Sequence, residues 1–230
     1  MTSGELAGAT IVFDLDGTLA DTAPDLTRVL NATLDIEGLA PLSVETARTM
    51  VGQGARELIQ RAAAVRGITF SPVRLGELTS AYIELYGREL VRDTKLFPGV
   101  EAALDQLAAL GAKLSVCTNK RTAYSEQVLQ ALGVANRFSA IVGADSVDNR
   151  KPHPDHYRAA VTRAGGVVRR SVMIGDTTAD VAAARAAGAP AAVVSFGYCD
   201  VECGKLGADA VLDRFSDVAP ACRRLLAARP

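Results

Sequence analysis

The sequence predicts an α/β protein: a Rossmann-like parallel sheet core with helices on both faces, and an inserted α-helical cap domain. Three observations predict this fold. Short apolar runs recur along the chain, helical patterns that mostly end before a glycine alternate with them, and the interval 20–95 holds helical patterns alone. Strands that alternate with helices pair in parallel, because each crossover returns the chain to the same end of the sheet.

The expected strands are continuous apolar runs, as is typical of strands buried on both faces of a parallel sheet. The first covers residues 10–15 and ends in acid. The others cover residues 112–118, 139–143, 171–175 and 191–195, with a weaker candidate at 210–212. Proline near the start and glycine after the end mark several of the helices between them. These helices are expected at 98–110, 122–132, 154–164, 178–187 and 216–228.

The interval 20–95 is far longer than a single crossover helix needs. It contains helical patterns at 24–37, 44–50, 55–65 and 72–92, and no convincing strand. Ser71 followed by Pro72 is a typical helix start, because serine accepts from a free backbone N–H and proline tolerates the first helical position. We therefore expect a catalytic core formed by residues 1–19 and 96–230, and a cap domain formed by residues 20–95.

Composition excludes several classes of protein. Of the 230 residues, 49 % are hydrophobic and 22 % are charged, which is ordinary for a globular protein and excludes a disordered chain. The net charge is −1, so no basic surplus points to nucleic acid or to an anionic membrane. No apolar run is long enough to cross a bilayer, and the first residues lack a secretory pattern. We expect a cytoplasmic protein, with monomer and homodimer both open.

The cysteines Cys117, Cys199, Cys203 and Cys222 contain no C-x-x-C pair, which argues against a zinc site. In a cytosolic protein the expected state of all four is the reduced thiol.

The first expected strand ends in the sequence DLDGT, which places Asp14 and Asp16 on the same side of an extended chain. Two adjacent carboxylates resist ionising together, and a divalent cation relieves that repulsion. Mg²⁺ prefers such oxygen ligands. Gly17 lets the chain turn sharply beside them. An acidic turn is the ordinary alternative for this motif on its own.

A second acidic motif follows the strand expected at 171–175. Asp176 stands at the strand end, and Asp180 lies in the first turn of the next helix. Asp180 alone would be an acid that complements the helix dipole. Because two strands end in paired acids, we expect the four carboxylates to converge on one cation.

Phosphate-binding chemistry is expected in two further segments. Thr118 and Asn119 follow the strand at 112–118, where a hydroxyl and backbone N–H groups at a helix start suit a phosphate. Lys151 precedes a proline-flanked helix start and offers a compact positive charge. An ordinary helix start and a solvated basic turn are the alternatives. For His153 and His156, helix-capping or surface roles are expected rather than metal ligation.

In this order and spacing, the motifs resemble the haloacid dehalogenase superfamily in its phosphatase branch. The resemblance rests on residues 14–18, Thr118, Lys151 and residues 175–180, and it covers the whole chain, with the helical insertion as the cap domain. Within the superfamily, the stretches DLDGTLADTAPDL, VGQGARELI, FPGV, TNK and RKPHPD resemble the bacterial phosphoglycolate phosphatase family.

The resemblance implies a catalytic role for each core motif. Asp14 would be the nucleophile that forms an aspartyl-phosphate. Asp16 would protonate the leaving alkoxide and then activate water. Thr118 and Lys151 would hold the phosphoryl oxygens, and the neighbouring Asn119 and Gly17 are further candidates for substrate contact. The implied cofactor is Mg²⁺, held by Asp14, the backbone carbonyl of Asp16, and Asp176, with Asp180 in support.

The resemblance also implies that the cap domain selects the substrate, a small phosphorylated metabolite for which 2-phosphoglycolate is the first candidate. Gly52 and Gly54 would let backbone amides approach a ligand at the start of a helix. Arg56, in the first turn of that helix, could pair bidentately with a carboxylate. The alternative is a flexible turn with a solvated arginine.

The motifs are also compatible in part with several other activities. Phosphatases of a sugar phosphate, a nucleotide or pyrophosphate share the core, as do β-phosphoglucomutase-like phosphomutases, although threonine at 18 weakly disfavours the latter. Asp16 argues against a dehalogenase, and the lack of lysine from residue 22 to residue 94 argues against a phosphonoacetaldehyde hydrolase. A phospho-aspartate signalling receiver has similar polar groups, but the long insertion and Asp16 favour turnover over a persistent phosphoryl switch.

Overall fold

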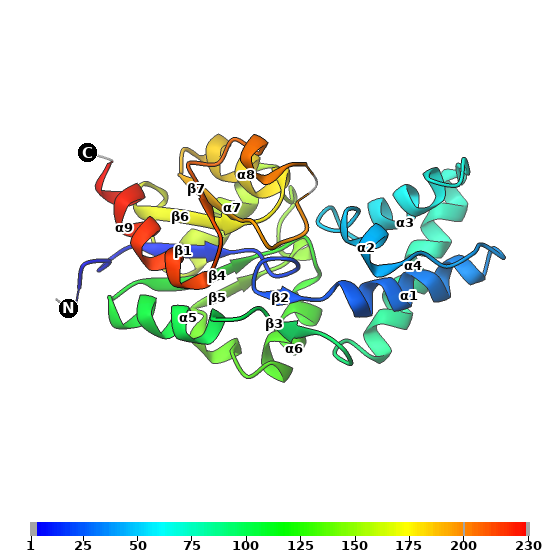
Figure 1. The fold of residues 1–230 in the computed structure, drawn as a ribbon, viewed down its shortest axis with the longest axis horizontal. Helices are drawn as coiled ribbons and strands as arrows, with labels where there is room; N and C mark the ends of the chain where they lie inside the picture. Colours follow the sequence, from blue (N-terminus) through cyan, green and yellow to red (C-terminus); the bar gives the residue numbers. More distant parts are fainter. Residues whose placement is uncertain (1–3, 200, 229–230) are drawn as a thin grey trace.

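The computed structural model describes residues 4–199 and 201–228. Its centre is a parallel sheet of six strands in the order β5-β4-β1-β6-β7-β8 (Figure 1). The strands are β1 (Thr10–Phe13), β4 (Lys113–Cys117), β5 (Ala140–Val142), β6 (Ser171–Gly175), β7 (Ala191–Val194) and β8 (Ala210–Leu212). All six predicted strands are therefore present, and the predicted α/β fold is confirmed. β1 lies at the centre, between β4 and β6, which leaves its carboxyl end beside two other strand ends.

Helices cover both faces of this sheet (Figure 1). One face carries α5 (Val100–Ala109), α6 (Thr122–Ala131) and α9 (Val218–Ala227), and the other carries α7 (Pro154–Arg163) and α8 (Thr178–Ala187). Successive residues of β1 divide between the faces: Ile11 and Phe13 belong to the first apolar cluster and Val12 to the second. This alternation is the period-two geometry of a strand that is buried on both sides.

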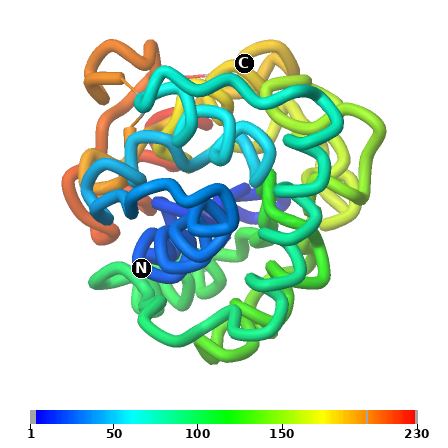
Figure 2. The backbone as a smooth tube through the Cα atoms, turned by 90° about the vertical axis from the view of Figure 1, so that its right-hand side faces the viewer, coloured from blue at the N-terminus to red at the C-terminus, as the bar shows by residue number. Residues whose placement is uncertain are grey.

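The cap domain consists of four helices that lie beyond the carboxyl ends of the strands (Figures 1 and 2). They are α1 (Ala23–Asp35), α2 (Val44–Arg48), α3 (Ala55–Ala64) and α4 (Pro72–Arg88). Ser71 accepts from the backbone N–H of Arg74, so the predicted helix start is confirmed. Leu30, Ile59 and Leu78 are fully buried between these helices, and they belong to the same apolar cluster as Ile11 and Phe13 of the sheet.

Two short strands join the core to the cap domain, and the prediction that this interval holds no strand is wrong. β2 (Ala20–Asp21) pairs antiparallel with β3 (Lys95–Leu96). Each is two residues long, too short for an alternating pattern to be visible in a sequence. The Asp25 carboxylate also accepts from the backbone N–H groups of residues 92–94, which ties the start of α1 to the returning chain.

The remaining helical turns are short 3₁₀ segments in the loops. They are η1 (Ala135–Arg137), η2 (Ala144–Ser146), η3 (Val168–Arg170), η4 (Cys203–Lys205) and η5 (Phe215–Asp217). None of the helices in the described part of the chain is long and apolar enough to span a membrane.

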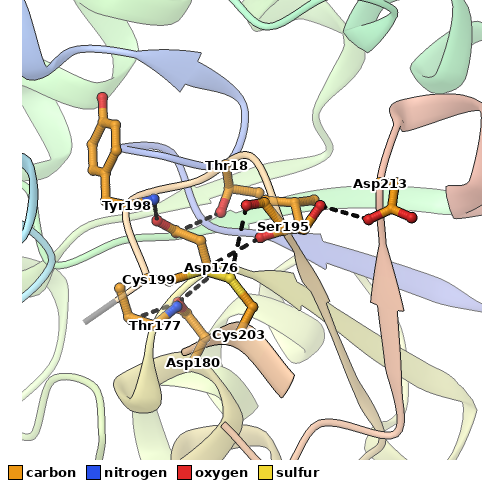
Figure 3. Close-up of a disulfide and its surroundings, with 10 residues drawn as sticks. Thr18, Asp176, Thr177, Asp180, Ser195, Tyr198, Cys199, Cys203 and Asp213 are labelled. Carbon is orange, nitrogen blue, oxygen red and sulfur yellow. Dashed lines mark hydrogen bonds between the residues drawn. A yellow bond between two sulfur atoms is a disulfide. The ribbon is translucent and has the colours of Figure 1, made fainter. Parts of the chain in front are cut away.

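Two of the four cysteines form a disulfide, so the prediction of four reduced thiols is wrong. Cys199 and Cys203 are bonded across a loop that follows β7 (Figure 3). Their Cα atoms lie 5.8 Å apart, well within the reach of a disulfide. Cys117 and Cys222 are free and buried.

Candidate active site

The carboxyl ends of the three central strands gather the predicted polar residues. Asp14 follows β1, Thr118 follows β4, and Asp176 follows β6, while Lys151 reaches the same place from the loop before α7. All four side chains are buried although they are polar. Burial of polar groups is costly unless they bind one another or a ligand, so their convergence marks this edge of the sheet as the candidate active site.

Three carboxylates form an acidic cluster at this edge. Asp14, Asp176 and Asp180 are buried, and each offers an oxygen within 4.8 Å of the others. The single cation among them is the ammonium of Lys151, 3.0 Å from Asp14 Oδ1 and 2.6 Å from Asp180 Oδ1. Of the four carboxylates predicted to converge, three therefore lie together, while the side chain of Asp16 points elsewhere.

The pKa directions in the cluster follow from this imbalance of charge. Burial, which outweighs the attraction of Lys151, raises the pKa of Asp14 to about 7, and the nearby Asp180 and Asp16 add to the rise. Burial and the charges of Asp180 and Asp14 also hold the pKa of Asp176 well above its usual value. Burial lowers the pKa of Lys151, but Asp14 and Asp180 reverse this and the net shift is upward. A bound divalent cation would relieve the excess negative charge.

Hydrogen bonds hold the two carboxylates at the end of β6 in fixed orientations (Figure 3). Asp180 Oδ2 accepts from the backbone N–H of Thr177 at 3.0 Å and from its hydroxyl at 2.7 Å, a capping box at the start of α8. Asp176 accepts from the Thr18 hydroxyl and from the backbone N–H of Tyr198, both at 2.8 Å. Asp180 therefore lies in the first turn of α8, where an acid complements the helix dipole, and it is also a member of the acidic cluster.

Tyr198 also ties the acidic cluster to the junction with the cap domain. Its hydroxyl donates to Asp21 Oδ1 at 2.9 Å and accepts from the backbone N–H of Ala23 at 2.8 Å. Arg48 of α2 lies over its ring and pairs with Asp21 at 2.6 Å. Tyr198, in the loop that follows β7, therefore contacts Asp176 of the cluster, Asp21 at the end of β2 and Ala23 at the start of α1.

Gly17 is required where it stands. Its φ of +84° lies in the left-handed region, and a Cβ there would lie 2.2 Å from Asp176 Oδ2 and 2.7 Å from the Tyr198 ring. The predicted sharp turn beside the acidic cluster is confirmed.

Asp16 lies beside the cluster with different partners. Its Oδ1 accepts from the Thr22 hydroxyl at 2.7 Å and faces the Lys120 ammonium at 2.9 Å. Lys120 in turn donates to the Tyr86 hydroxyl of α4 at 3.1 Å. Sequence reasoning missed Lys120 as a site residue. The only available signal was its position in the TNK sequence directly after a strand end.

His156 contacts the backbone of Lys151 from within the core. The prediction of a capping or surface role for this histidine is therefore wrong. It is fully buried in α7, its Nδ1 accepts from the backbone N–H of Lys151 at 3.1 Å, and its Nε2 lies 3.1 Å from the carbonyl of Val142. Burial, followed by the nearby Lys151 charge, lowers the pKa of His156 to about 4. His153 does cap α7, since its side chain accepts from the backbone N–H of Asp155.

Asn119 joins the core site to the cap domain. Its amide nitrogen donates to the carbonyl of Gly52 at 3.0 Å and to that of Lys151 at 3.1 Å. Its buried Oδ1 has no hydrogen-bond partner in the described chain, and an acceptor left free in this way suits a ligand.

A pocket between the strand ends and the cap domain encloses these groups. From the core it is lined by Asp14, Asp16, Thr118, Asn119 and Lys120, and from the cap domain by Val51, Arg56, Leu58, Tyr82, Ile83 and Tyr86. Arg56 is exposed where it lines the pocket, and it makes no side-chain ion pair or hydrogen bond within the described residues. The pocket therefore brings Asp14, Asp16, Thr118 and Asn119 together with Arg56. Lys151, Asp176 and Asp180 lie beside Asp14 without lining the pocket.

The arrangement of carboxylates, a hydroxyl and a lysine at the strand ends, beside one pocket, agrees with the comparison to known families. Residues 11–194 match the model of the haloacid dehalogenase-like hydrolases. The chain belongs to this family. In a haloacid dehalogenase-like hydrolase the observed inserted helical domain and parallel core are both expected, so the fold and the family agree.

This hydrolase is similar over nearly its whole length to relatives named phosphoglycolate phosphatase. The relative from Caulobacter vibrioides is 45 % identical over 226 residues, covering 98 % of this chain and 95 % of the relative. The one from Agrobacterium fabrum is 41 % identical, covering 96 % and 94 %. Among solved structures, that of a predicted phosphoglycolate phosphatase from Haemophilus somnus has a TM-score of 0.85 at 29 % identity, covering 94 % and 98 %.

Proposed function

We propose that this protein is a Mg²⁺-dependent phosphomonoester hydrolase that converts 2-phosphoglycolate to glycolate and phosphate through an aspartyl-phosphate on Asp14. The observation that carries the chemistry is the pairing of the buried Asp14 carboxylate with Lys151 at 3.0 Å, next to Asp16 in one pocket. The observation that supports the substrate is the near full-length similarity to named phosphoglycolate phosphatases. Residues 20–95 would act as the cap domain over the reacting group.

Asp14 would attack the phosphorus atom, splitting one difficult displacement into two easier ones. Lys151 and the Thr118 hydroxyl would hold phosphoryl oxygens whose charge repels an anionic nucleophile. Asp16 would donate a proton to the departing glycolate oxygen and then accept one from the attacking water, a contribution of about 10²–10⁴-fold. Its Thr22 and Lys120 partners keep that carboxylate aimed into the pocket rather than at the acidic cluster.

The acidic cluster suits a magnesium ion. Asp14 and Asp176 would supply carboxylate oxygens, the Asp16 backbone carbonyl a third ligand, and Asp180 support from α8. When bound, Mg²⁺ would supply positive charge that offsets the carboxylates and the phosphoryl oxygens. The upward pKa shifts of Asp14 and Asp176 support this assignment, because such groups bind protons when no cation neutralises them.

In the cap domain, Arg56 would approach the carboxylate of the substrate from the rim of the pocket. It lies in the first turn of α3, next to Gly54, whose φ of +86° starts the helix. Asn119 and Gly17 would shape the phosphoryl side of the pocket. The apolar side chains of α1, α3 and α4 that line the rest leave room for a small organic group and exclude water around it.

A panel of phosphate esters tests the function. We expect the highest kcat/KM for 2-phosphoglycolate, against sugar phosphates, nucleotides, pyrophosphate and an aryl phosphate, each with Mg²⁺. A sugar phosphate that outcompetes it would overturn the substrate and leave the phosphatase chemistry intact. Stoichiometric, persistent labelling without turnover would identify a receiver-like switch instead, and transfer of the phosphoryl group to a second sugar hydroxyl would identify a phosphomutase.

A further inference from the structure

The roles above leave one buried charge in the pocket unexplained, the ammonium group of Lys120. The side chain is only 6 % exposed. Burial lowers its pKa, but the Asp16 carboxylate and Tyr86 outweigh this and hold it above the ordinary value, so Lys120 is a cation. Burying a cation is costly unless anionic groups pair with it. Among the described residues, Lys120 pairs with one acid, the Asp16 carboxylate at 2.9 Å.

An ammonium group has three N–H donors, and two of those of Lys120 are accounted for. One faces Asp16 at 2.9 Å and another faces the Tyr86 hydroxyl at 3.1 Å, with the Tyr86 ring centroid 4.6 Å from Nζ. For the third donor, no protein acceptor lies within hydrogen-bond distance in the described chain. Because Lys120 lines the pocket, that donor is available to a ligand.

The walls around this donor are mostly apolar. Leu26, Val51, Leu58, Tyr82 and Ile83 line the cap side of the same pocket. In such surroundings a charge-assisted hydrogen bond is strengthened, because little water competes for it. A neutral leaving group would meet the ammonium without pairing with it, whereas an anionic one would complete its set of acceptors.

The position of Lys120 also fits the chemistry of the leaving group. The oxygen that Asp16 protonates must come within hydrogen-bond reach of that carboxyl. In 2-phosphoglycolate a single methylene separates this oxygen from the carboxylate carbon. A cation adjacent to Asp16 therefore stands where the carboxylate of that substrate arrives.

Resting on the proposed function, we infer that Lys120 is a specificity-determining residue that binds the carboxylate of the leaving group with its third donor. It acts from the core, deep in the pocket, whereas Arg56 stands exposed on the rim. Tyr86 belongs to α4, so the cap domain holds the other side of the same ammonium group. The ligand class that this site takes is a phosphate ester with an anionic group one carbon from the ester oxygen.

The test compares 2-phosphoglycolate with ethyl phosphate, whose leaving group has no carboxylate and no other acceptor at that position, in the Mg²⁺-loaded enzyme. We expect Lys120→Met to lower the ratio of their kcat/KM values about 10- to 100-fold, since a hydrogen bond to a charged group is lost for one substrate only. Lys120→Arg, which keeps the charge, should retain most of the ratio. A loss that acts only through Asp16 would lower both values together and leave the ratio unchanged, which would overturn the inference.

A matched control is Arg158→Met, which also removes one positive charge from the core. Arg158 lies in α7, is 46 % exposed, pairs with Asp155 at 3.2 Å and does not line the pocket, so the ratio should change less than about threefold. An equal change in both variants would attribute the effect to net charge and contradict a direct contact.

Two further measurements separate the possible failures. If wild-type enzyme does not prefer 2-phosphoglycolate, the proposed function fails; if the preference is present and survives Lys120→Met, only the role of Lys120 fails. Should Lys120→Met not fold, as judged by thermal unfolding, Lys120→Gln replaces it. Inhibition by 3-phosphonopropionate relative to propylphosphonate gives a second readout, and we expect the preference for the carboxylated inhibitor to fall in the lysine variants by a similar factor.

Discussion

The core and cap sides of the pocket use charge in opposite ways. On the core side, Asp14, Lys151 and Asp180 are buried, and the Lys151 ammonium group contacts Asp14 at 3.0 Å and Asp180 at 2.6 Å, so it fixes the positions of both. On the cap side, Arg56 is exposed and unpaired within the described chain, and its neighbours in the pocket are apolar or aromatic. The comparison teaches that the chemistry is built into a rigid cluster of charges, while selection depends on a few groups around an apolar space.

This contrast predicts two classes of variant. Changes to the core residues that would hold the phosphoryl group or the metal should reduce turnover of every phosphate ester, because the phosphoryl group is common to them all. Changes to Arg56 of the cap domain, or to Lys120 of the core, should alter which ester is preferred, because they meet only the leaving group.

Removal of the metal should have the largest effect. Three buried carboxylates face one lysine, so the cluster without a cation is short of positive charge. We expect activity toward every ester to vanish in excess chelator and to return with Mg²⁺. Ca²⁺ should inhibit, because it takes more ligands at longer distances and would displace the nucleophile. Full activity in excess chelator would contradict the metal dependence of the core-side chemistry. As a second readout, Mg²⁺ binding should raise the melting temperature of the protein.

Asp16→Asn should reduce kcat by about 10²–10⁴-fold on all esters, because an amide can neither protonate the leaving oxygen nor activate water. KM should change far less, since the Thr118 and Lys151 contacts to the phosphoryl group remain. Steady-state kinetics on 2-phosphoglycolate and an aryl phosphate provide the measurement. A large rise in KM with kcat intact would show that Asp16 binds substrate rather than transferring protons.

Arg56→Ala should lower kcat/KM for 2-phosphoglycolate by about 10-fold, the loss of one charge-assisted contact that is partly open to solvent. For an uncharged aryl phosphate the loss should be much smaller. Equal losses on both substrates would mean that Arg56 supports the cap domain or its closure. A suitable control is Arg61→Ala, one turn further along α3, whose guanidinium pairs with Glu57.

The smallest expected effect concerns stability and pH, through His156 beneath Lys151. Its pKa is about 4 in the folded protein and near 6.5 when the chain unfolds, so below pH 6.5 the unfolded chain binds a proton that the folded protein excludes. The free energy of unfolding should therefore fall, by up to about 3 kcal/mol, as the pH drops from 6.5 toward 4. Denaturant unfolding of wild type and His156→Gln should show a shallower pH dependence in the variant. Identical slopes would contradict the role of His156.

How far the sequence predicts this structure depends on the length over which each signal extends. Apolar runs and helix punctuation located the six strands and the four cap helices, because many residues contribute to each pattern. β2 and β3 were missed because two residues carry no period. The disulfide between Cys199 and Cys203 was missed because it depends on the two Cα atoms lying 5.8 Å apart, a distance that the spacing in the sequence does not reveal.

The site residues likewise fall into those that the sequence predicted and those that it did not. Asp14, Asp176 and Lys151 were located because parallel strand ends meet at one edge of a sheet, a consequence of topology alone. Lys120 and His156 were not located, because their contacts with Tyr86 and Val142 arise only when separate elements pack together. Local sequence thus predicted the strand-end chemistry but not the contacts that fix its charges.

The central claim is that phosphoryl transfer passes through Asp14, and trapping the phosphoenzyme tests it most directly. Enzyme mixed with 2-phosphoglycolate labelled in its phosphoryl group and quenched in acid within one turnover should carry label on the peptide that contains Asp14. Glycolate should be released in a burst before phosphate, and Asp14→Asn should show neither label nor turnover. Release of phosphate by wild-type enzyme without any labelled protein, or label on a peptide that lacks Asp14, would contradict the account.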